Sequence, residues 1–208
     1  PVMIFEDCDI ETAAKLCVAG KFRNAGQVCI SPTRFFVQEN IHDKFLKLFK
    51  EHVEAMKVGN GLDEQMSMGP LVAERRINVM DGFISDAISK GAELLVGGEP
   101  IQSEGSFFAP TLLQEVPDTA KVMIDEPFGP IAPTARFTSL DEVVERANSL
   151  PFGLAAYAFT ESAKTAGVLK QEIETGMLAI NSIHVHSVET PFGGLKFSGY
   201  GYEGGIEG

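Results

Sequence analysis

Short runs of β-forming residues alternate with amphipathic helical stretches along most of the chain, and this alternation limits the possible folds more than any other feature. The expected strands cover residues 2–5, 34–38, 94–96, 131–137, 154–159 and 177–181, and the expected helices cover 10–19, 45–56, 77–88, 140–147 and 162–174. We expect the first helix to end at Gly20. Strands that alternate with helices predict a layered α/β domain.

The composition narrows the functional classes. The chain has 208 residues, of which 44% are hydrophobic and 22% charged, and its net charge is -12. An acidic surface repels phosphate backbones, so we expect no nucleic-acid partner. No apolar run approaches the roughly 20 residues that a bilayer span needs, and no signal peptide opens the chain, so we expect no membrane partner. An odd number of cysteines, three, favours a reducing, cytoplasmic location.

Both ends of the sequence have the character of internal segments. The chain begins at Pro1 without a methionine and enters an apolar run at once, and it ends at Gly208 within a glycine-rich segment. We therefore expect residues 1–208 to be one domain of a longer protein, truncated at both ends. No repeat and no long linker divides them.

Three cysteines are candidates for a reactive thiol. Cys17 falls on the inner face of the first expected helix and is expected in the core. Cys8 lies in the acidic turn 6–9, where neighbouring carboxylates suppress a thiolate. Cys29 lies in a loop near Arg23, and a cation beside a loop thiol favours the thiolate. Cys29 is therefore the best of the three nucleophile candidates.

Three motifs, in order, carry a family resemblance. They are FRNAGQVC at 22–29, EPFGP at 126–130, and PFGGLK at 191–196 followed by Ser198-Gly199. Together they resemble the aldehyde dehydrogenase superfamily, and the resemblance covers essentially the whole chain. Residues 21–29, with Ser187 ahead of the last motif, are most similar to succinate-semialdehyde and 2-oxoglutarate-semialdehyde dehydrogenases.

The resemblance implies a fold and a reaction. The fold would be the aldehyde dehydrogenase catalytic domain, a three-layer α/β structure with a mostly parallel sheet and helices on both faces. Cys29 would attack the aldehyde carbon, the resulting thiohemiacetal would lose hydride to NAD or NADP, and water would hydrolyse the thioester to the acid. The main-chain N–H of Cys29 would be one oxyanion donor.

Two residues of the second motif are implied cofactor ligands. Glu126 matches the glutamate that binds the nicotinamide ribose, and a carboxylate can accept from both hydroxyls of a diol. On the sequence alone, a surface acid is the better interpretation of this residue. Phe128 matches a residue beside the nicotinamide, with ordinary core packing as the alternative.

Three residues are implied substrate ligands. Arg23 matches the arginine that pairs with the distal carboxylate of a semialdehyde, and its planar fork suits that group. A structural ion pair is the alternative. Ser187 matches a serine that assists the same carboxylate, unless it is a solvent-exposed loop hydroxyl. Phe192 resembles a residue that lines the aldehyde tunnel.

Several family parts are missing from this sequence. The segment with the general base and the dinucleotide-binding domain would precede Pro1, so we expect the isolated 208 residues to be inactive. Ser31 stands where some relatives carry a second cysteine, so we expect no redox disulfide there. His184 and His186 form an H-x-H pair without a third ligand nearby, so we expect no metal site.

Two other functions remain open at this level. A cysteine hydrolase would need a histidine that activates Cys29, which a sequence cannot exclude. A non-catalytic module would only contribute to assembly. The family's catalytic domain takes part in oligomer contacts, and the resemblance therefore implies a homodimer or homotetramer for the full-length enzyme.

Overall fold

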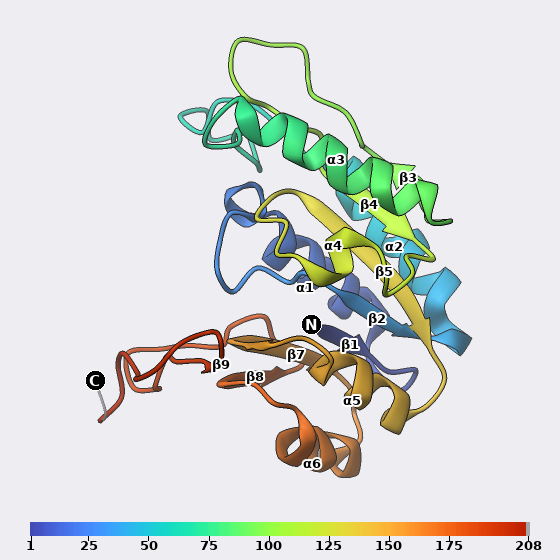
Figure 1. Cartoon of the computed structure of the whole chain (residues 1–208), viewed down its shortest axis with the longest axis vertical. Coiled ribbons are helices and arrows are strands. Elements are labelled where there is room, and N and C mark those ends of the chain that lie inside the picture. The colour runs from blue at the N-terminus through green and yellow to red at the C-terminus, as the bar shows by residue number, and fades with distance from the viewer. Residues whose placement is uncertain (207–208) are drawn as a thin grey trace.

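One seven-stranded sheet forms the centre of the molecule in the computed structural model, which describes residues 1–206 (Figure 1). Its strand order is β3-β4-β5-β2-β1-β7-β8. The strands are β1 Val2–Ile4, β2 Phe35–Gln38, β3 Glu93–Val96, β4 Thr111–Gln114, β5 Ile131–Phe137, β7 Ala155–Phe159 and β8 Met177–Ile180. Neighbouring strands are parallel except β3 and β4, which are antiparallel. The expected mostly parallel sheet is confirmed.

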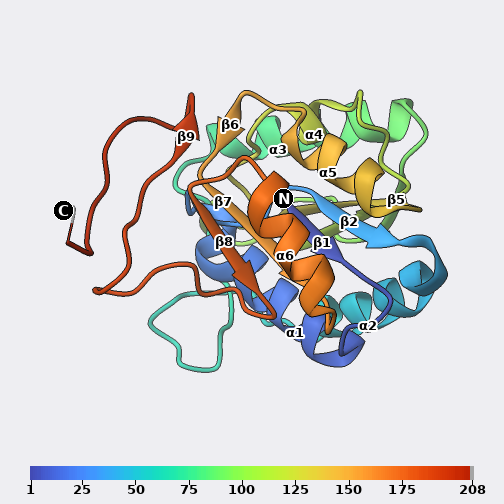
Figure 2. The ribbon, with the colours of Figure 1, turned by 90° about the horizontal axis from the view of Figure 1, so that it is seen from below.

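Helices cover both faces of this sheet, which confirms the three-layer arrangement (Figures 1 and 2). The helices are α1 Ile10–Phe22, α2 His42–Glu54, α3 Arg75–Ser89, α4 Lys121–Ile124, α5 Leu140–Asn148 and α6 Ala163–Glu172, with short 3-10 turns η1 Arg23–Gly26 and η2 Glu39–Ile41. The paired helices α1 and α2 pack on one face, and α3, α4 and α5 lie on the other. Helix α6 lies beside α5.

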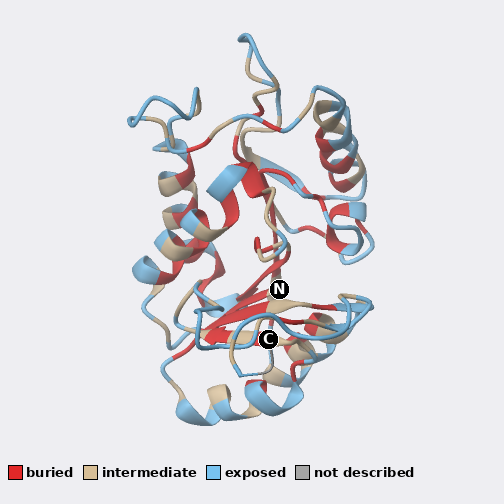
Figure 3. Ribbon diagram, turned by 90° about the vertical axis from the view of Figure 1, so that its left-hand side faces the viewer, coloured by how far each residue is buried: buried red, intermediate tan, exposed pale blue. Residues whose placement is uncertain are grey.

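The core lies between these layers (Figure 3). The central strand β1 is buried along its whole length, with Met3 paired to Phe36 on one side and Ala158 on the other. Parallel strands covered on both faces are apolar throughout, as this one is. Under β2, the rings of Phe35 and Phe45 pack against Phe49. None of the described helices combines the length and hydropathy that a bilayer crossing requires.

The first helix is longer than expected. It passes through Gly20 and ends at Phe22, so the predicted end at Gly20 is wrong. Gly20 has a packing role instead, because a Cβ there would lie 3.3 Å from the Cγ2 atom of Ile183. The helix ends where Arg23 turns to extended backbone, with ψ 129°.

A small two-stranded sheet, which the sequence did not predict, ties the third motif to the domain. Strand β6, Phe152–Gly153, pairs antiparallel with β9, Leu195–Lys196. The ammonium of Lys196 also donates to the carbonyl oxygens of Asn148 at 3.0 Å and Leu150 at 3.1 Å. Residues 195–196 are thereby anchored to the segment that follows α5.

Candidate active site

A tight left-handed coil sets the position of Cys29. Asn24, Ala25 and Gly26 follow each other with φ of 52°, 54° and 70°. Two side-chain bonds brace the coil: the Asn24 amide donates to the Gln27 carbonyl, and the Gln27 amide donates to the Asn24 carbonyl, each at 3.0 Å. The chain then turns outward and leaves Cys29 exposed.

Three hydrogen bonds hold the cysteine turn, residues 28–31, in place. The Ser31 N–H donates to the Val28 carbonyl at 2.8 Å, and the Ser31 hydroxyl donates to the Lys21 carbonyl at 3.1 Å. The hydroxyl of Tyr157, in β7, donates to the Ile30 carbonyl at 2.6 Å. The turn is therefore fixed to both α1 and the sheet.

The other two cysteines lack the access and the surroundings of a nucleophile. Burial is the main cause that raises the pKa of the Cys8 thiol to about 12, and the carboxylates of Asp7 and Asp9 add to it. The sequence indicated only these carboxylates. Cys17 is fully buried in α1, as expected, and burial raises its pKa well above the ordinary value.

The second motif forms a loop that α3 holds in place. One guanidinium nitrogen of Arg76 donates to the Pro127 carbonyl at 2.6 Å and lies 3.4 Å from the Phe128 carbonyl. Phe128 takes a positive φ of 42°, and its side chain is 39% exposed, so ordinary core packing does not describe it. Glu126 is exposed as a whole residue, but neighbouring atoms partly shield its carboxyl from water, and this desolvation raises the pKa of the carboxyl.

Gln27 links the cysteine loop to the segment that leads into α3. Its amide donates to the Pro70 carbonyl at 3.3 Å, and its carbonyl oxygen accepts from the Val72 N–H at 2.8 Å. Arg76, at the start of α3, binds the second motif. The cysteine loop and the second motif, about 100 residues apart in the sequence, are therefore both held by α3 and the residues just before it.

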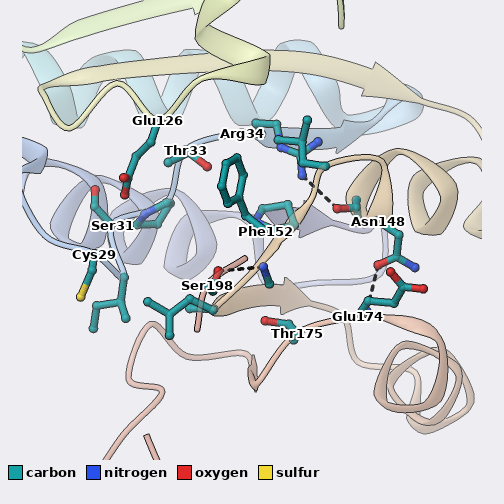
Figure 4. Close-up of a pocket in the computed structure, with 18 of the residues that line it drawn as sticks. Cys29, Ser31, Thr33, Arg34, Glu126, Asn148, Phe152, Glu174, Thr175 and Ser198 are labelled. Atoms are coloured by element: carbon teal, nitrogen blue, oxygen red, sulfur yellow. Dashed lines mark hydrogen bonds between the residues drawn. The ribbon is translucent and has the colours of Figure 1, made fainter. Parts of the chain in front are cut away.

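Cys29 and Glu126 line the same pocket, which has a volume of about 350 Å³ (Figure 4). Ser31, Thr33, Phe152 and Ser198 also line it. Figure 4 shows Cys29, Ser31 and Glu126 toward one end of this pocket and Asn148 and Glu174 toward the other. A thiol that can act as a nucleophile and a carboxylate that can accept from hydroxyls therefore open to one cavity.

A buried lysine lies close to Ser31 and Glu126, two residues that line the pocket. Lys21, near the end of α1, has no exposed surface, and its ammonium has no hydrogen-bond partner among the described residues. Burial lowers its pKa to about 7, and the nearby carboxylate of Glu126 opposes that change. The sequence predicts a loop from Lys21 to Ser31 and gives no sign of this burial, but Lys21 lies in the last turn of α1.

Arg23 is exposed and its guanidinium makes no ion pair or hydrogen bond within residues 1–206. The structural ion pair that was its alternative thus has no partner in the described part of the chain. Burial raises the pKa of the Tyr157 phenol. The charge of Arg23 opposes this rise, and the charge of Cys29 adds to it. Arg23 does not line the pocket, so its role stays a prediction.

Ser187 and Phe192 do not line this pocket, and both belong to the segment that follows β8. The Ser187 hydroxyl is 3.4 Å from that of Thr190, a local turn contact. Phe192 exchanges main-chain hydrogen bonds with Glu203, and its ring lies edge-on to His186 at 5.6 Å between centroids. Their assignments as substrate residues stay predictions.

Residues 1–206 contain no hydrogen-bonded Cys–His pair of the kind that a cysteine hydrolase needs. No histidine is hydrogen-bonded to Cys29 in the part of the chain that the structure describes, and His184 and His186 are exposed. Within the same residues, no group of three or more histidine, cysteine, aspartate or glutamate side chains could hold a metal ion.

Three residues that shape the site were not predicted from the sequence: Lys21, Arg76 and Tyr157. In the sequence, Tyr157 is one residue of a predicted strand, and Arg76 lies next to a predicted helix. Their partners are 51 residues away for Arg76 and 127 for Tyr157, so no local pattern could have indicated them.

Comparison with known proteins agrees with the motifs. The family described as "Aldehyde dehydrogenase family" matches residues 1–208. A 4-(hydroxymethyl)benzenesulfonate dehydrogenase of Comamonas testosteroni is 44% identical over 208 residues, which are 100% of this chain and 43% of that protein. The NADP-dependent succinate-semialdehyde dehydrogenase of Escherichia coli is 39% identical over 210 residues, again 100% of this chain and 43% of the relative.

The solved structures agree with the fold. The crystal structure of an NAD-dependent aldehyde dehydrogenase from Sinorhizobium meliloti superposes with a TM-score of 0.97 at 35% identity, covering 100% of this chain and 41% of that one. The chain thus spans less than half the length of the relatives it matches.

Proposed function

The chain belongs to the aldehyde dehydrogenase family, and from this we propose that residues 1–208 are the catalytic domain of an NAD(P)-dependent enzyme that oxidises an aldehyde to its acid. The relatives are more than twice as long, so the dinucleotide-binding domain and the general base are assigned to the remainder of a longer polypeptide. The shared pocket of Cys29 and Glu126 is the observation that supports this proposal best.

Cys29 is the proposed nucleophile. Its thiolate adds to the aldehyde carbon and forms a thiohemiacetal, whose oxyanion its own main-chain N–H can stabilise. Loss of hydride from that carbon leaves a thioester on Cys29, and water then releases the acid and the thiol. The exposed position of Cys29 gives an aldehyde access to the sulfur, which the surroundings of Cys8 and Cys17 do not.

The residues present suit the nicotinamide end of NAD or NADP. Glu126 offers an exposed carboxylate at the pocket, which can accept hydrogen bonds from both hydroxyls of a ribose. Phe128, on the same loop, offers a partly exposed ring. When bound, the oxidised cofactor supplies the acceptor for the hydride.

Arg23 supports an anionic substrate. Its guanidinium is six residues from the nucleophile and has no partner within the described residues, so it is free to bind a carboxylate on the substrate. We assign a carboxylated semialdehyde such as succinate semialdehyde, with Ser187 and Phe192 as further substrate residues. The names of the two relatives, a semialdehyde dehydrogenase and a sulfonate dehydrogenase, agree with an anionic tail.

The assembly and location follow the same proposal. We assign a homodimer or homotetramer to the full-length enzyme, with a small aldehyde as its partner and the cytoplasm as its location. The three free cysteines agree with a reducing compartment. Sedimentation of the full-length enzyme tests the oligomeric state, and a monomer at working concentration would contradict it.

The decisive experiment follows NAD(P)H formation by the full-length enzyme with succinate semialdehyde. Cys29→Ser should abolish turnover, since an uncharged hydroxyl is a far weaker nucleophile than a thiolate. Cys8→Ser is the matched control and should retain it. Release of acid from an ester, with no NAD(P)H from any aldehyde, would support a hydrolase instead.

A further inference from the structure

The hydroxyl of Tyr157 reaches from the sheet to the peptide that follows Cys29. Tyr157 is 2% exposed, and its hydroxyl donates to the Ile30 carbonyl oxygen at 2.6 Å. The partners are 127 residues apart in the sequence, so this bond joins the cysteine turn to a distant element. A phenylalanine would fill the same volume, and the hydroxyl is therefore the part that needs an explanation.

Tyr157 has a rigid base. It lies in β7, between β1 and β8, and its Cα is paired with Val2 on one side and Ala179 on the other. The turn of residues 28–31 has no strand pairing of its own: Ser31 bonds to Val28 within the turn and to the Lys21 carbonyl in α1, and Tyr157 adds the bond to the sheet. A hydroxyl fixed to the sheet can hold the turn in one position, which matters because small displacements of a nucleophile reduce its rate steeply.

The bond also has an electrostatic effect. A carbonyl oxygen carries partial negative charge, so an unpaired one beside Cys29 would oppose a thiolate there. The phenol hydrogen bond occupies this oxygen. Burial, with a smaller contribution from Cys29, raises the pKa of the phenol, and Arg23 opposes that rise. The phenol therefore stays protonated, and remains a donor, at neutral pH.

From this contact we infer that Tyr157 is a positioning residue for Cys29, acting through the Ile30 carbonyl. The inference rests on the proposed function only in taking Cys29 as the nucleophile. The aldehyde and the cofactor do not enter it.

Tyr157→Phe in the full-length enzyme tests the inference. Loss of the hydroxyl should slow alkylation of Cys29 by iodoacetamide about tenfold, and kcat by a similar factor. KM for NAD(P) should stay unchanged, because the loop that carries Glu126 is held by Arg76 and not by Tyr157. Replacement of Tyr157 by para-aminophenylalanine keeps a donor at the same place and should restore both rates.

Two controls separate positioning from general damage. Tyr200→Phe removes a hydroxyl from a fully exposed tyrosine and should change nothing. Phe159→Leu weakens the core of the same strand and should lower the melting temperature without slowing alkylation.

Unchanged alkylation in Tyr157→Phe would overturn the inference, as would equal slowing in Phe159→Leu or no rescue by the amine. If Tyr157→Phe does not fold, the rate of the amine variant decides alone. If the wild-type enzyme forms no NAD(P)H, the proposed function fails, while the alkylation rates still decide the role of Tyr157.

Discussion

Gly26 packs directly against Gly129, so the backbones of the cysteine loop and of the loop 126–130, which carries Glu126, touch. A Cβ on Gly26 would lie far inside van der Waals distance of the Gly129 carbonyl oxygen. Gly26 also has a φ of 70°, in the left-handed region that side chains disfavour. The distance between Cys29 and Glu126 across the pocket therefore depends on a contact that only glycine permits.

Gly26→Ala should separate the two loops. The left-handed backbone alone costs alanine about 1 kcal/mol, and relief of the clash must move one loop. We expect a lower melting temperature together with a raised KM for NAD(P), because Glu126 moves relative to Cys29. Thermal unfolding and steady-state kinetics measure the two effects.

Gly82→Ala is the control for this prediction. Gly82 lies in α3, and a Cβ added there would have no neighbouring atom within 4 Å, so alanine should stabilise the helix by up to about 1 kcal/mol. If Gly26→Ala were as harmless as Gly82→Ala, the contact with Gly129 would not set the pocket.

Strand β5 and the end of α1 show which parts of the fold the sequence can predict and which it cannot. Strand β5 was predicted at residues 131–137 and is found there, because a short, largely apolar run bounded by turn residues favours a strand. The end of α1 does not fall where Gly20 predicts it, because this glycine makes room for Ile183 and does not stop the helix. A glycine that permits close packing and one that ends a helix have the same letter.

In the candidate site, too, the sequence predicts some features and not others. The choice of Cys29 over Cys8 and Cys17 rested on local charge and position, and both are visible in the sequence. Burial, which contributes most to the raised pKa of Cys8, depends on the folded chain. The partners of Arg76 and Tyr157 likewise depend on packing between distant segments.

Lys21 should make stability depend on pH. Its pKa is about 7 when folded and about 10.4 when unfolded. Between these values the unfolded state holds a proton that the folded state has lost, so the free energy of unfolding should rise with pH by up to about 1.4 kcal/mol per unit. Below about pH 7 both states are protonated, and the full cost of the buried charge remains.

Lys21→Met should remove this slope. The variant should exceed the wild type in stability most at or below about pH 7, and the difference should shrink toward about pH 10. Urea unfolding at several pH values measures it. Lys44→Met, at an exposed position of α2, should leave the slope intact. A wild-type slope that survives in Lys21→Met would show that Lys21 does not titrate in this range.

Arg76→Met should loosen the loop that carries Glu126. The substitution leaves the Pro127 carbonyl without its 2.6 Å donor, and Phe128 without a neighbouring cation at its backbone. A charge-assisted bond contributes about 1.5–3 kcal/mol, so KM for NAD(P) should rise about tenfold or more while KM for the aldehyde changes little. Arg75→Met removes the adjacent exposed arginine and should leave both constants unchanged. Equal rises in both KM values would indicate general unfolding of α3 instead.

Arg23→Ala should change substrate preference more than it changes chemistry. The guanidinium is exposed and unpaired within residues 1–206, so its removal breaks no contact that the described chain depends on. A charge-assisted pair with a carboxylate is worth about 1.5–3 kcal/mol, which predicts a loss of kcat/KM with succinate semialdehyde of about 10- to 100-fold. Butanal has the same length and no charge, and its kcat/KM should fall less than about threefold.

Two further variants separate charge from geometry at this position. Arg23→Lys keeps the charge but not the planar fork, so it should recover only part of the activity with succinate semialdehyde. Arg75→Ala removes an exposed arginine at the start of α3 and should leave kcat/KM unchanged with both aldehydes. Equal losses with both aldehydes in Arg23→Ala would instead assign Arg23 to the support of the Cys29 turn, through its charge on the Tyr157 phenol. The ratio of the two kcat/KM values therefore decides whether this arginine faces the substrate or the loop.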